Sequence, residues 1–295
     1  MLTQKQKLIR LDKVTCSQIG NIIGCGYGTQ YEAYRAIKGL SEIKETEKME
    51  WGNRLELEVA KKCSEVHNVF ILRNNETVIK DGWICGTPDF YVVRDGKNEG
   101  LEVKTASEFM KKEWGDGDEI PLQYYLQCVG YMYLTGFEVW NLAVLIGGQT
   151  YRDYAIKRDL EREAKIITKL RQWYDTHIVK GVEPEMTLTD VQARYNESQS
   201  SVVEADDHIS MCVEQIRELK QKENVLKAQQ EELKAVVMTY MKDHDTLIAN
   251  GKKAVTWKTQ SRKSLDTKAM AKDFGDLSQY EKTTTSRIFR LAGEE

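Results

Sequence analysis

The stretch from residue 83 to residue 157 constrains the fold most. In it, three short β-type runs precede one long apolar segment and two more follow it. The β-type runs are residues 83–87, 89–94, 100–105, 139–146 and 150–157. The apolar segment, residues 121–135, begins at Pro121 and is long enough for roughly four helical turns, so we expect a helix there. Strands that continue after an intervening helix predict a mixed α/β domain.

Further helices and strands are predicted on either side of this stretch. Helix-type patterns occupy residues 17–23, 30–38, 49–66 and 159–179, and two more β-type runs occupy residues 69–72 and 77–80. Leu55, Val59 and Cys63 recur at the spacing of one helix face. We therefore assign residues 1–186 to one α/β core, in which helices flank a mixed central sheet.

The character of the chain changes after Pro184. Residues 187–205 are polar and predict a linker, which leaves residues 206–295 as an accessory region. A long helix is predicted there by apolar residues in a heptad rhythm, broken at Glu223 and Gln230. The heptad residues are Ile209, Cys212, Ile216, Leu219, Leu226, Leu233, Val237 and Tyr240. We favour packing of this face within the chain over a coiled coil.

The end of the accessory region combines turn signals with positive charge. Asn250-Gly251 between two β-type runs predicts a hairpin. A short helix is expected from Ser264, and a closing strand is expected over residues 283–291. Ten Lys or Arg residues face four Asp or Glu residues between positions 251 and 290, so this segment is locally basic.

Charge and cysteine usage narrow the class of protein. A net charge of −3 argues against a passive nucleic-acid coat, so any surface for nucleic acid must be a local patch. The six cysteines are scattered, without zinc-finger spacing. Neither an apolar signal region nor an apolar run of about 18 residues is present. These features predict a reduced, cytoplasmic protein without a membrane anchor.

Two carboxylates and one ammonium group are expected to share a small site. Glu102 and Lys104 lie two residues apart on a predicted strand, so both side chains leave the same face. A hairpin with the preceding strand brings Asp89 beside Glu102. Hard carboxylate oxygens bind Mg²⁺, which can polarise a phosphate and lower the pKa of a bound water. Lys104 can then orient or deprotonate that water.

The simpler interpretation is that these charges are ordinary solvated side chains. Two observations favour a site. Leu101 and Val103 alternate with Glu102 and Lys104, which marks a strand buried on one side. Gly86 and Pro88 are turn-forming residues immediately before Asp89.

Five motifs in order resemble a known family. They are Arg10–Ser17, Trp51–Glu56, Pro88-Asp89 with Glu102–Lys104, Phe109–Lys111, and Tyr124–Gln127 with Tyr131-Met132. Together they resemble the YqaJ-type viral recombinase family, which includes the lambda-type alkaline exonucleases and belongs to the PD-(D/E)XK nuclease superfamily. The resemblance covers roughly residues 8–180. It implies a restriction-endonuclease-like PD-(D/E)XK core, here with a long helix and β-hairpin added at the C-terminus.

The resemblance also implies residue roles. Six side chains are implied to be catalytic: Glu56, Asp89, Glu102, Lys104, Gln127 and Tyr124. The implied metal ligands are Asp89, Glu102, the Val103 carbonyl and Glu56. Three residues are implied to bind a 5′-terminal phosphate: Arg10, Ser17 and Thr87. Simpler roles exist for several of them: an exposed charge for Glu56, a buried amide serving the backbone for Gln127, and a helix cap for Ser17.

The activity implied is 5′ to 3′ degradation of linear double-stranded DNA, which leaves 3′ single-stranded overhangs. The implied cofactor is Mg²⁺, with Mn²⁺ as a substitute and two ions per site. The implied partners are a single-strand annealing protein and further copies of the chain in a ring-shaped trimer, inside a bacterial host. The alternatives are another PD-(D/E)XK nuclease (endonuclease, junction resolvase or Cas4-like enzyme) or a non-catalytic DNA-binding module. A Cas4-like enzyme requires a four-cysteine iron–sulfur set, which these cysteines do not offer.

Overall fold

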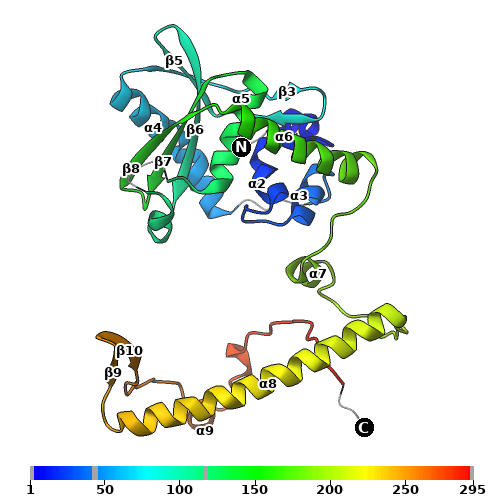
Figure 1. Cartoon of the computed structure of the whole chain (residues 1–295), viewed down its shortest axis with the longest axis vertical. Helices are drawn as coiled ribbons and strands as arrows, with labels where there is room; N and C mark the ends of the chain where they lie inside the picture. The colour runs from blue at the N-terminus through cyan, green and yellow to red at the C-terminus, as the bar shows by residue number, and fades with distance from the viewer. Residues whose placement is uncertain (1–2, 42–45, 116–118, 293–295) are drawn as a thin grey trace. The chain divides into compact units, whose positions relative to one another are not determined.

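A five-stranded mixed sheet forms the centre of the first part of the computed structural model, which describes residues 3–41, 46–115 and 119–292 (Figure 1). In spatial order its strands are β2 (Phe70–Arg73), β5 (Phe90–Arg94), β6 (Lys97–Ala106), β7 (Val139–Ile146) and β8 (Thr150–Lys157). The β6–β7 pair is parallel, and the other three pairs are antiparallel. The chain divides into two units, Met1–Arg194 and Tyr195–Glu295, and the sheet lies in the first.

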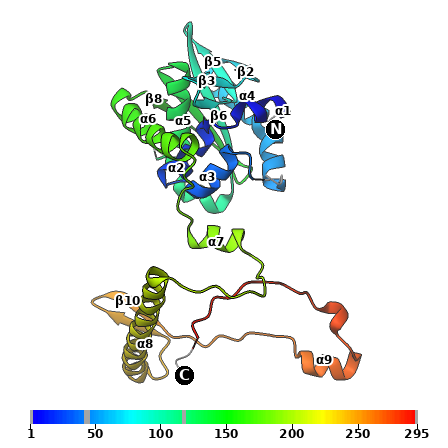
Figure 2. The ribbon, with the colours of Figure 1, turned by 90° about the vertical axis from the view of Figure 1, so that its right-hand side faces the viewer.

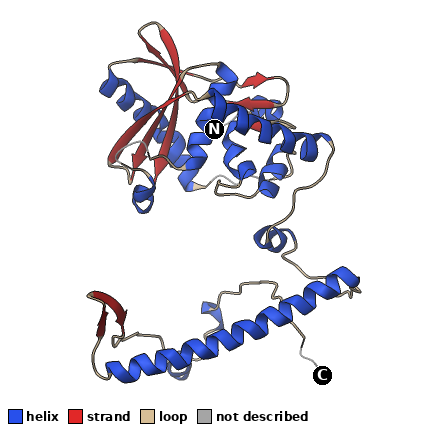
Figure 3. Cartoon of the chain, in the orientation of Figure 1, coloured by secondary structure: helices blue, strands red, loops and turns tan. Residues whose placement is uncertain are grey.

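Helices cover both faces of this sheet, as Figure 3 shows. On one face, α4 (Glu47–His67) packs Val59, Ala60 and Cys63 against alternate residues of β5 and β6. On the other face lies the larger core, to which four helices contribute: α2 (Ile19–Ile23), α3 (Gln30–Ile37), α5 (Leu122–Thr135) and α6 (Leu160–Tyr174). The two-residue period of β6 sends Leu101 and Val103 to the α4 face, so Glu102 and Lys104 point toward α5.

A second, three-stranded sheet joins the N-terminus to the residues that precede Asp89. Its order is β1 (Val14–Thr15), β4 (Ile84–Gly86) and β3 (Val78–Lys80). The β1–β4 pair is parallel, with Val14 opposite Ile84. Helix α1 (Gln4–Arg10) precedes β1, and a short 3-10 turn, η1 (Cys16–Gln18), follows it. Both α1 and the first half of α4 line one cavity of this unit, and Figure 2 shows the two helices on the same flank.

The predicted mixed α/β class is confirmed, but the polar segment after residue 187 contains a helix. This helix, α7 (Leu188–Arg194), is placed within the first unit. Asp190 explains why so polar a segment is ordered. Its carboxylate is buried and accepts hydrogen bonds from the Thr29 and Thr187 hydroxyls, at 2.9 and 2.7 Å. The assignment of residues 1–186, 187–205 and 206–295 to core, linker and accessory region stays a prediction.

Two short irregular elements complete the first unit. The segment η2 (Glu108–Glu113) follows β6, and the π-helical turn η3 (Asp175–Val179) extends α6. Gly86 is not the turn residue predicted from the sequence but the last residue of β4. A Cβ at this position would lie 2.6 Å from the Tyr131 ring and 2.9 Å from Cys16 Sγ, so glycine is needed for close packing.

The second unit contains the predicted long helix, α8 (Asp207–Met241), and the predicted hairpin of β9 (Thr246–Ala249) and β10 (Lys252–Thr256). Positive φ angles at Asn250 and Gly251 form its turn. Helix α9 (Thr267–Phe274) and the turn η4 (Ser278–Tyr280) follow. Within this unit the heptad residues Leu219, Leu226 and Leu233 are exposed on α8.

The closing strand predicted over residues 283–291 is wrong. These residues lie within the described part of the chain and form no strand. A strand needs a neighbour for its backbone hydrogen bonds, and β9 and β10 pair only with each other. Among the helices that the structure describes, none combines the length and the apolarity required to cross a bilayer.

Candidate functional site

The pairing of β5 with β6 places Asp89 beside Glu102. Phe90 pairs with Leu101, so Asp89, one residue before Phe90, lies next to Glu102 in the antiparallel register. Asp89 Oδ2 accepts a hydrogen bond of 2.9 Å from the Val103 backbone N–H. The carboxylate thereby takes a backbone donor at the end of the β5–β6 ladder, which fixes its position relative to Glu102.

Glu102 is the most enclosed carboxylate of the group, with 2% of its surface exposed. Its Oε1 accepts hydrogen bonds from Lys104 Nζ at 2.5 Å and from Gln127 Nε2 at 2.6 Å. Gln127 comes from α5, which follows β6 in the chain and packs on the same face of the sheet. The amide of Gln127 serves side chains and not the backbone, contrary to its simpler interpretation.

Tyr131 holds Gln127 in place. It lies one helical turn after Gln127 and accepts a hydrogen bond of 3.0 Å from the same Nε2. The Tyr131 hydroxyl donates in turn to the Thr87 carbonyl at 3.2 Å. Tyr131 is also part of the buried core, and its i, i+4 spacing from Gln127 is the sequence signal for this contact.

The second oxygen of Glu102 is buried and has no hydrogen-bond partner among the described residues. A buried carboxylate oxygen without a partner is costly, and it suits a missing cation. Burial raises the pKa of Asp89 well above its ordinary value, and the neighbouring Glu102 charge raises it further. Burial also raises the pKa of Glu56, against the opposing effect of Arg73. The neighbouring Lys104 and Arg73 do not fully offset burial and the repulsion between carboxylates at Asp89 and Glu56, and the hard carboxylate oxygens fit a divalent cation.

Among the described residues, Lys104 supplies the one ammonium group in direct contact with Glu102. Burial lowers the pKa of Lys104, but the Glu102 and Asp89 carboxylates outweigh burial, so the net shift is upward. Its Nζ also lies 5.3 Å from the centre of the Tyr124 ring, which stacks on Trp114 at 5.3 Å. Tyr124 thus contacts Lys104 in a cation–π arrangement.

Glu56, on α4, lines the same cavity as Asp89 and Glu102. It is held by Arg73, which the sequence does not indicate as a site residue. Arg73 Nη2, at the end of β2, donates to Glu56 Oε1 at 2.8 Å. Only 21% of the Glu56 side chain is exposed, so it is not the ordinary exposed charge of the simpler interpretation. The β2–β5 register, with Arg73 opposite Phe90, brings the guanidinium here. That register is not visible in the sequence.

The residues predicted for a 5′-phosphate line the same cavity as the carboxylates. This cavity has a volume of about 780 Å³. Its lining includes seven of the predicted site residues: Arg10, Ser17, Glu56, Thr87, Asp89, Glu102 and Gln127. Among the described residues, Lys104 and Tyr124 are not part of this lining. The Val103 side chain packs on the opposite face of the sheet, and its N–H serves Asp89.

Ser17 does not cap a helix. Its hydroxyl accepts a hydrogen bond of 3.2 Å from Arg10 Nη2 and lies 3.2 Å from the Thr15 hydroxyl. The residue at the helix N-cap is Gln18, whose side chain makes no cap hydrogen bond. The Thr87 hydroxyl lies 2.9 Å from the Thr77 hydroxyl. The Arg10 guanidinium and the Ser17 and Thr87 hydroxyls therefore belong to the residues that line the cavity with the carboxylates.

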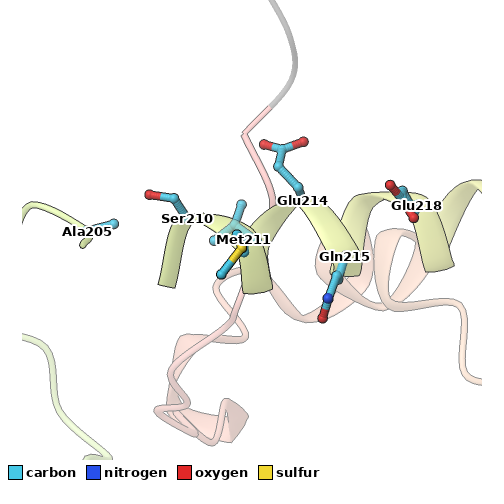
Figure 4. Close-up of a pocket in the computed structure, with 7 residues that line it drawn as sticks. Ala205, Ser210, Met211, Glu214, Gln215 and Glu218 are labelled. Carbon is cyan, nitrogen blue, oxygen red and sulfur yellow. The ribbon is translucent and has the colours of Figure 1, made fainter. Parts of the chain in front are cut away.

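A second hollow lies in the other unit, along the first turns of α8 (Figure 4). Its volume is about 540 Å³, and its lining includes the carboxylates of Glu214 and Glu218. The lining of this hollow, all within the described residues, includes no basic side chain and none of the predicted site residues. The chemistry predicted from the sequence is therefore confined to the first unit.

Comparison with known proteins agrees with the resemblance found in the sequence. Residues 7–138 match the family model of the YqaJ-like viral recombinase domain. No curated protein matches the chain. Among solved structures, the alkaline exonuclease LHK-Exo from Laribacter hongkongensis is 18% identical, with 60% of this chain and 95% of that chain covered and a TM-score of 0.47. A phage related exonuclease from Haemophilus somnus 129PT is 16% identical, with coverage of 58% and 96% and a TM-score of 0.42.

Proposed function

We propose that this chain is a magnesium-dependent DNA exonuclease. The premise is the match of residues 7–138 to the YqaJ-like viral recombinase domain. The enzyme degrades one strand of linear duplex DNA from the 5′ end and leaves a 3′ single-stranded overhang. One observation supports this most: the buried Glu102–Lys104–Gln127 network, with Asp89 beside it, opens into a cavity lined also by Arg10 and Ser17.

The residues divide into three tasks. Asp89, Glu102 and the Val103 carbonyl would hold the metal, and Glu56 would serve a second ion. When bound, Mg²⁺ or its substitute Mn²⁺ supplies charge that polarises the scissile phosphate and lowers the pKa of an attacking water. Lys104 orients that water through its contact with Glu102. Gln127 and Tyr124 hold Glu102 and Lys104 in register.

The proposed 5′ to 3′ direction of digestion rests on three residues that line the cavity together with the carboxylates. Arg10 offers a guanidinium, and Ser17 and Thr87 offer hydroxyls, a set suited to a terminal phosphate. A 5′-phosphorylated end seated there presents its first phosphodiester to the carboxylates. The 3′ overhang passes to a single-strand annealing protein in the cytoplasm of a bacterial host. Copies of the chain assemble as a ring-shaped trimer around the duplex.

The test is digestion of a linear duplex with one 5′-phosphorylated and one 5′-hydroxyl end, each strand carrying its own label. We expect loss of nucleotides from the 5′-phosphorylated strand, in the presence of Mg²⁺ and not of a chelator. Asp89→Asn and Lys104→Ala should abolish digestion while binding of duplex ends persists.

Matched controls come from the same hairpin. Asp95→Asn and Lys97→Ala change the same residue types at exposed positions of the β5–β6 hairpin and should digest DNA at the wild-type rate. Digestion at that rate by Asp89→Asn or Lys104→Ala would refute the assignment. Nicking of a relaxed circular duplex would point to an endonuclease instead. Binding without magnesium-dependent cleavage would point to a non-catalytic DNA-binding module.

A further inference from the structure

A second group of potential metal ligands lies on the other face of the sheet. Cys63 and His67 are one helical turn apart on α4, and Asp153 comes from the edge strand β8. Cys63 Sγ, a ring nitrogen of His67 and a carboxylate oxygen of Asp153 all lie within 4.8 Å of one another. Among the described residues, no other group of three or more His, Cys, Asp or Glu side chains meets this criterion.

The ligand types differ from those around Glu102. A thiolate, an imidazole and one carboxylate are borderline-soft ligands, which favour Zn²⁺ or a similar transition metal over Mg²⁺. Bond lengths of roughly 2.0–2.3 Å to zinc give ligand atoms about 3.3–3.8 Å apart in a tetrahedral site. His67 Nε2 and Asp153 Oδ2 are now 2.8 Å apart and share a proton. Small side-chain shifts, with the proton of neutral His67 carried on its other ring nitrogen, would allow a metal to bind between these two atoms.

The surroundings are those of a built site. Tyr151 donates a hydrogen bond of 2.8 Å to Asp153 Oδ2, which fixes the carboxylate as outer partners of metal ligands commonly do. Cys63 is buried with 2% of its surface exposed, whereas His67 and Asp153 keep 31% and 22% of their side chains exposed. The site therefore has a buried anchor and a path for an ion from solvent.

We propose that Cys63, His67 and Asp153 form a transition-metal site, with Zn²⁺ as the ion that fits best and water as the fourth ligand. The Cys63 thiol releases its proton to solvent as the sulfur–metal bond forms. Neutral His67 and the Asp153 carboxylate complete the protein ligands, so the site as a whole is electrically neutral. The ion joins α4 to β8 and stabilises the fold independently of the proposed nuclease activity.

The competing interpretation is a hydrogen-bonded network without metal. The Tyr151–Asp153–His67 contacts satisfy these polar groups as they stand. Burial also raises the pKa of the Cys63 thiol, with some relief from a hydrogen bond with Tyr151. A metal must therefore compete with a proton at sulfur, and its affinity should rise with pH. An experiment that detects the metal–sulfur bond itself separates the two interpretations.

The test is a Co²⁺ titration of the full chain with Mg²⁺ in large excess, which occupies hard oxygen sites. The parent carries Cys25→Ser and Cys212→Ser, which removes two thiols that are not buried. We expect a thiolate-to-cobalt charge-transfer absorption that saturates near one equivalent per chain and is displaced by Zn²⁺. Zn²⁺ should also raise the melting temperature of the parent.

Single substitutions in this parent decide the outcome. Cys63→Ser should remove the absorption, and Asp153→Asn should weaken Co²⁺ binding at least about tenfold while keeping the side-chain shape. Glu65→Gln, on an exposed turn of the same helix, is the matched control and should change neither. No absorption in the parent, or absorption that persists in Cys63→Ser, would overturn the proposal. If Cys63→Ser proves unstable, undiminished binding by Asp153→Asn overturns it equally.

Discussion

Gln127 Nε2 lies 2.6 Å from Glu102 Oε1. Helix α5, which follows strand β6 in the sequence, therefore positions a carboxylate of that strand. The contact is buried, and Gln127 has Tyr131 as its only other side-chain partner among the hydrogen bonds of the described residues. Glu102 Oε2 is left free to meet a ligand. The proposed metal ligand is thus oriented by α5.

We expect Gln127→Leu to lower kcat for DNA digestion by roughly 10- to 100-fold, the usual cost of losing a partner that orients a metal ligand. The Mg²⁺ concentration for half-maximal rate should rise, because Glu102 becomes free to rotate. Steady-state kinetics over a Mg²⁺ series measure both effects. Gln172→Leu changes an exposed amide on α6 and is the control. An unchanged Mg²⁺ requirement in Gln127→Leu would limit Gln127 to a packing role.

Asp89→Asn should raise the melting temperature of the metal-free protein at neutral pH. Burial and the Glu102 charge raise the pKa of Asp89 in the folded state. Asp89 therefore contributes stability below its unfolded-state pKa, and this contribution is lost as the pH rises through the folded-state pKa. At higher pH the ionised Asp89 carboxylate destabilises the folded protein. Each kcal/mol of stability that Asp89→Asn restores corresponds to roughly 2–4 °C in melting temperature.

Calorimetry with and without Mg²⁺ measures this effect. Mg²⁺ should raise the melting temperature of the wild type and raise that of Asp89→Asn less, because ligand binding stabilises the folded state in proportion to affinity. The difference between variant and wild type should shrink at acid pH, where Asp89 is protonated. Asp95→Asn should show neither change. A lower melting temperature for Asp89→Asn at neutral pH would contradict the expected sign.

Gly86→Ala should lower both stability and activity. The added Cβ would lie 2.6 Å from the Tyr131 ring and 2.9 Å from Cys16 Sγ, closer than carbon contacts allow. Overpacking of this kind costs about 1–3 kcal/mol, which chemical denaturation measures. Because Tyr131 holds Gln127, DNA digestion should slow as well.

Gly52→Ala is the control for this substitution. A Cβ at Gly52, in α4, would meet its nearest atom, Thr105 Oγ1, at the ordinary contact distance of 3.6 Å. Alanine also favours a helix over glycine by about 1 kcal/mol, so stability should rise. Equal stability of the Gly86→Ala and wild-type proteins would show that Tyr131 adjusts freely.

Arg10→Gln should reduce the preference for 5′-phosphorylated over 5′-hydroxyl ends. Loss of one charge-assisted hydrogen bond costs about 1.5–3 kcal/mol, or roughly 10- to 150-fold in discrimination. The rate on 5′-hydroxyl ends should stay near that of the wild type, because Arg10 contacts Ser17 and none of the carboxylates. Competition between the two end types in one digestion measures the ratio.

Arg162→Gln, an exposed guanidinium on α6, controls for the loss of a positive charge. It should leave the ratio of the two rates unchanged. Equal loss of rate on both end types in Arg10→Gln would indicate a general DNA contact and not a phosphate pocket.

Local sequence patterns predicted the carboxylate pair, because its geometry depends on local rules. The two-residue period of β6 and the β5–β6 hairpin were enough to place Asp89, Glu102 and Lys104 together. Glu56 was different, since its place depends on how α4 docks and on Arg73 from β2. Docking and strand register between distant segments leave little trace in one sequence.

Two differences between the predicted and the observed elements have physical causes. Residues 283–291 have β-type composition, but a strand forms only where another backbone offers hydrogen bonds. Residues 188–194 look like linker, yet buried Asp190 joins α7 to Thr29. In both cases tertiary contacts decided an outcome that local propensity could not.

The parallel pairing of β1 with β4 is a two-residue ladder, and it is the sole strand pairing of the N-terminal segment within the described residues. The groups proposed to cut DNA, apart from Glu56, come from the continuous stretch between residues 87 and 127, whereas Arg10 and Ser17 precede and follow β1. Two of the three residues proposed to bind a DNA end therefore lie outside the segment that holds most of the proposed hydrolytic residues, whereas the third, Thr87, lies within it. Under the proposed function, substitutions at Arg10 or Ser17 can change which DNA ends are accepted while the residues proposed for hydrolysis stay unchanged.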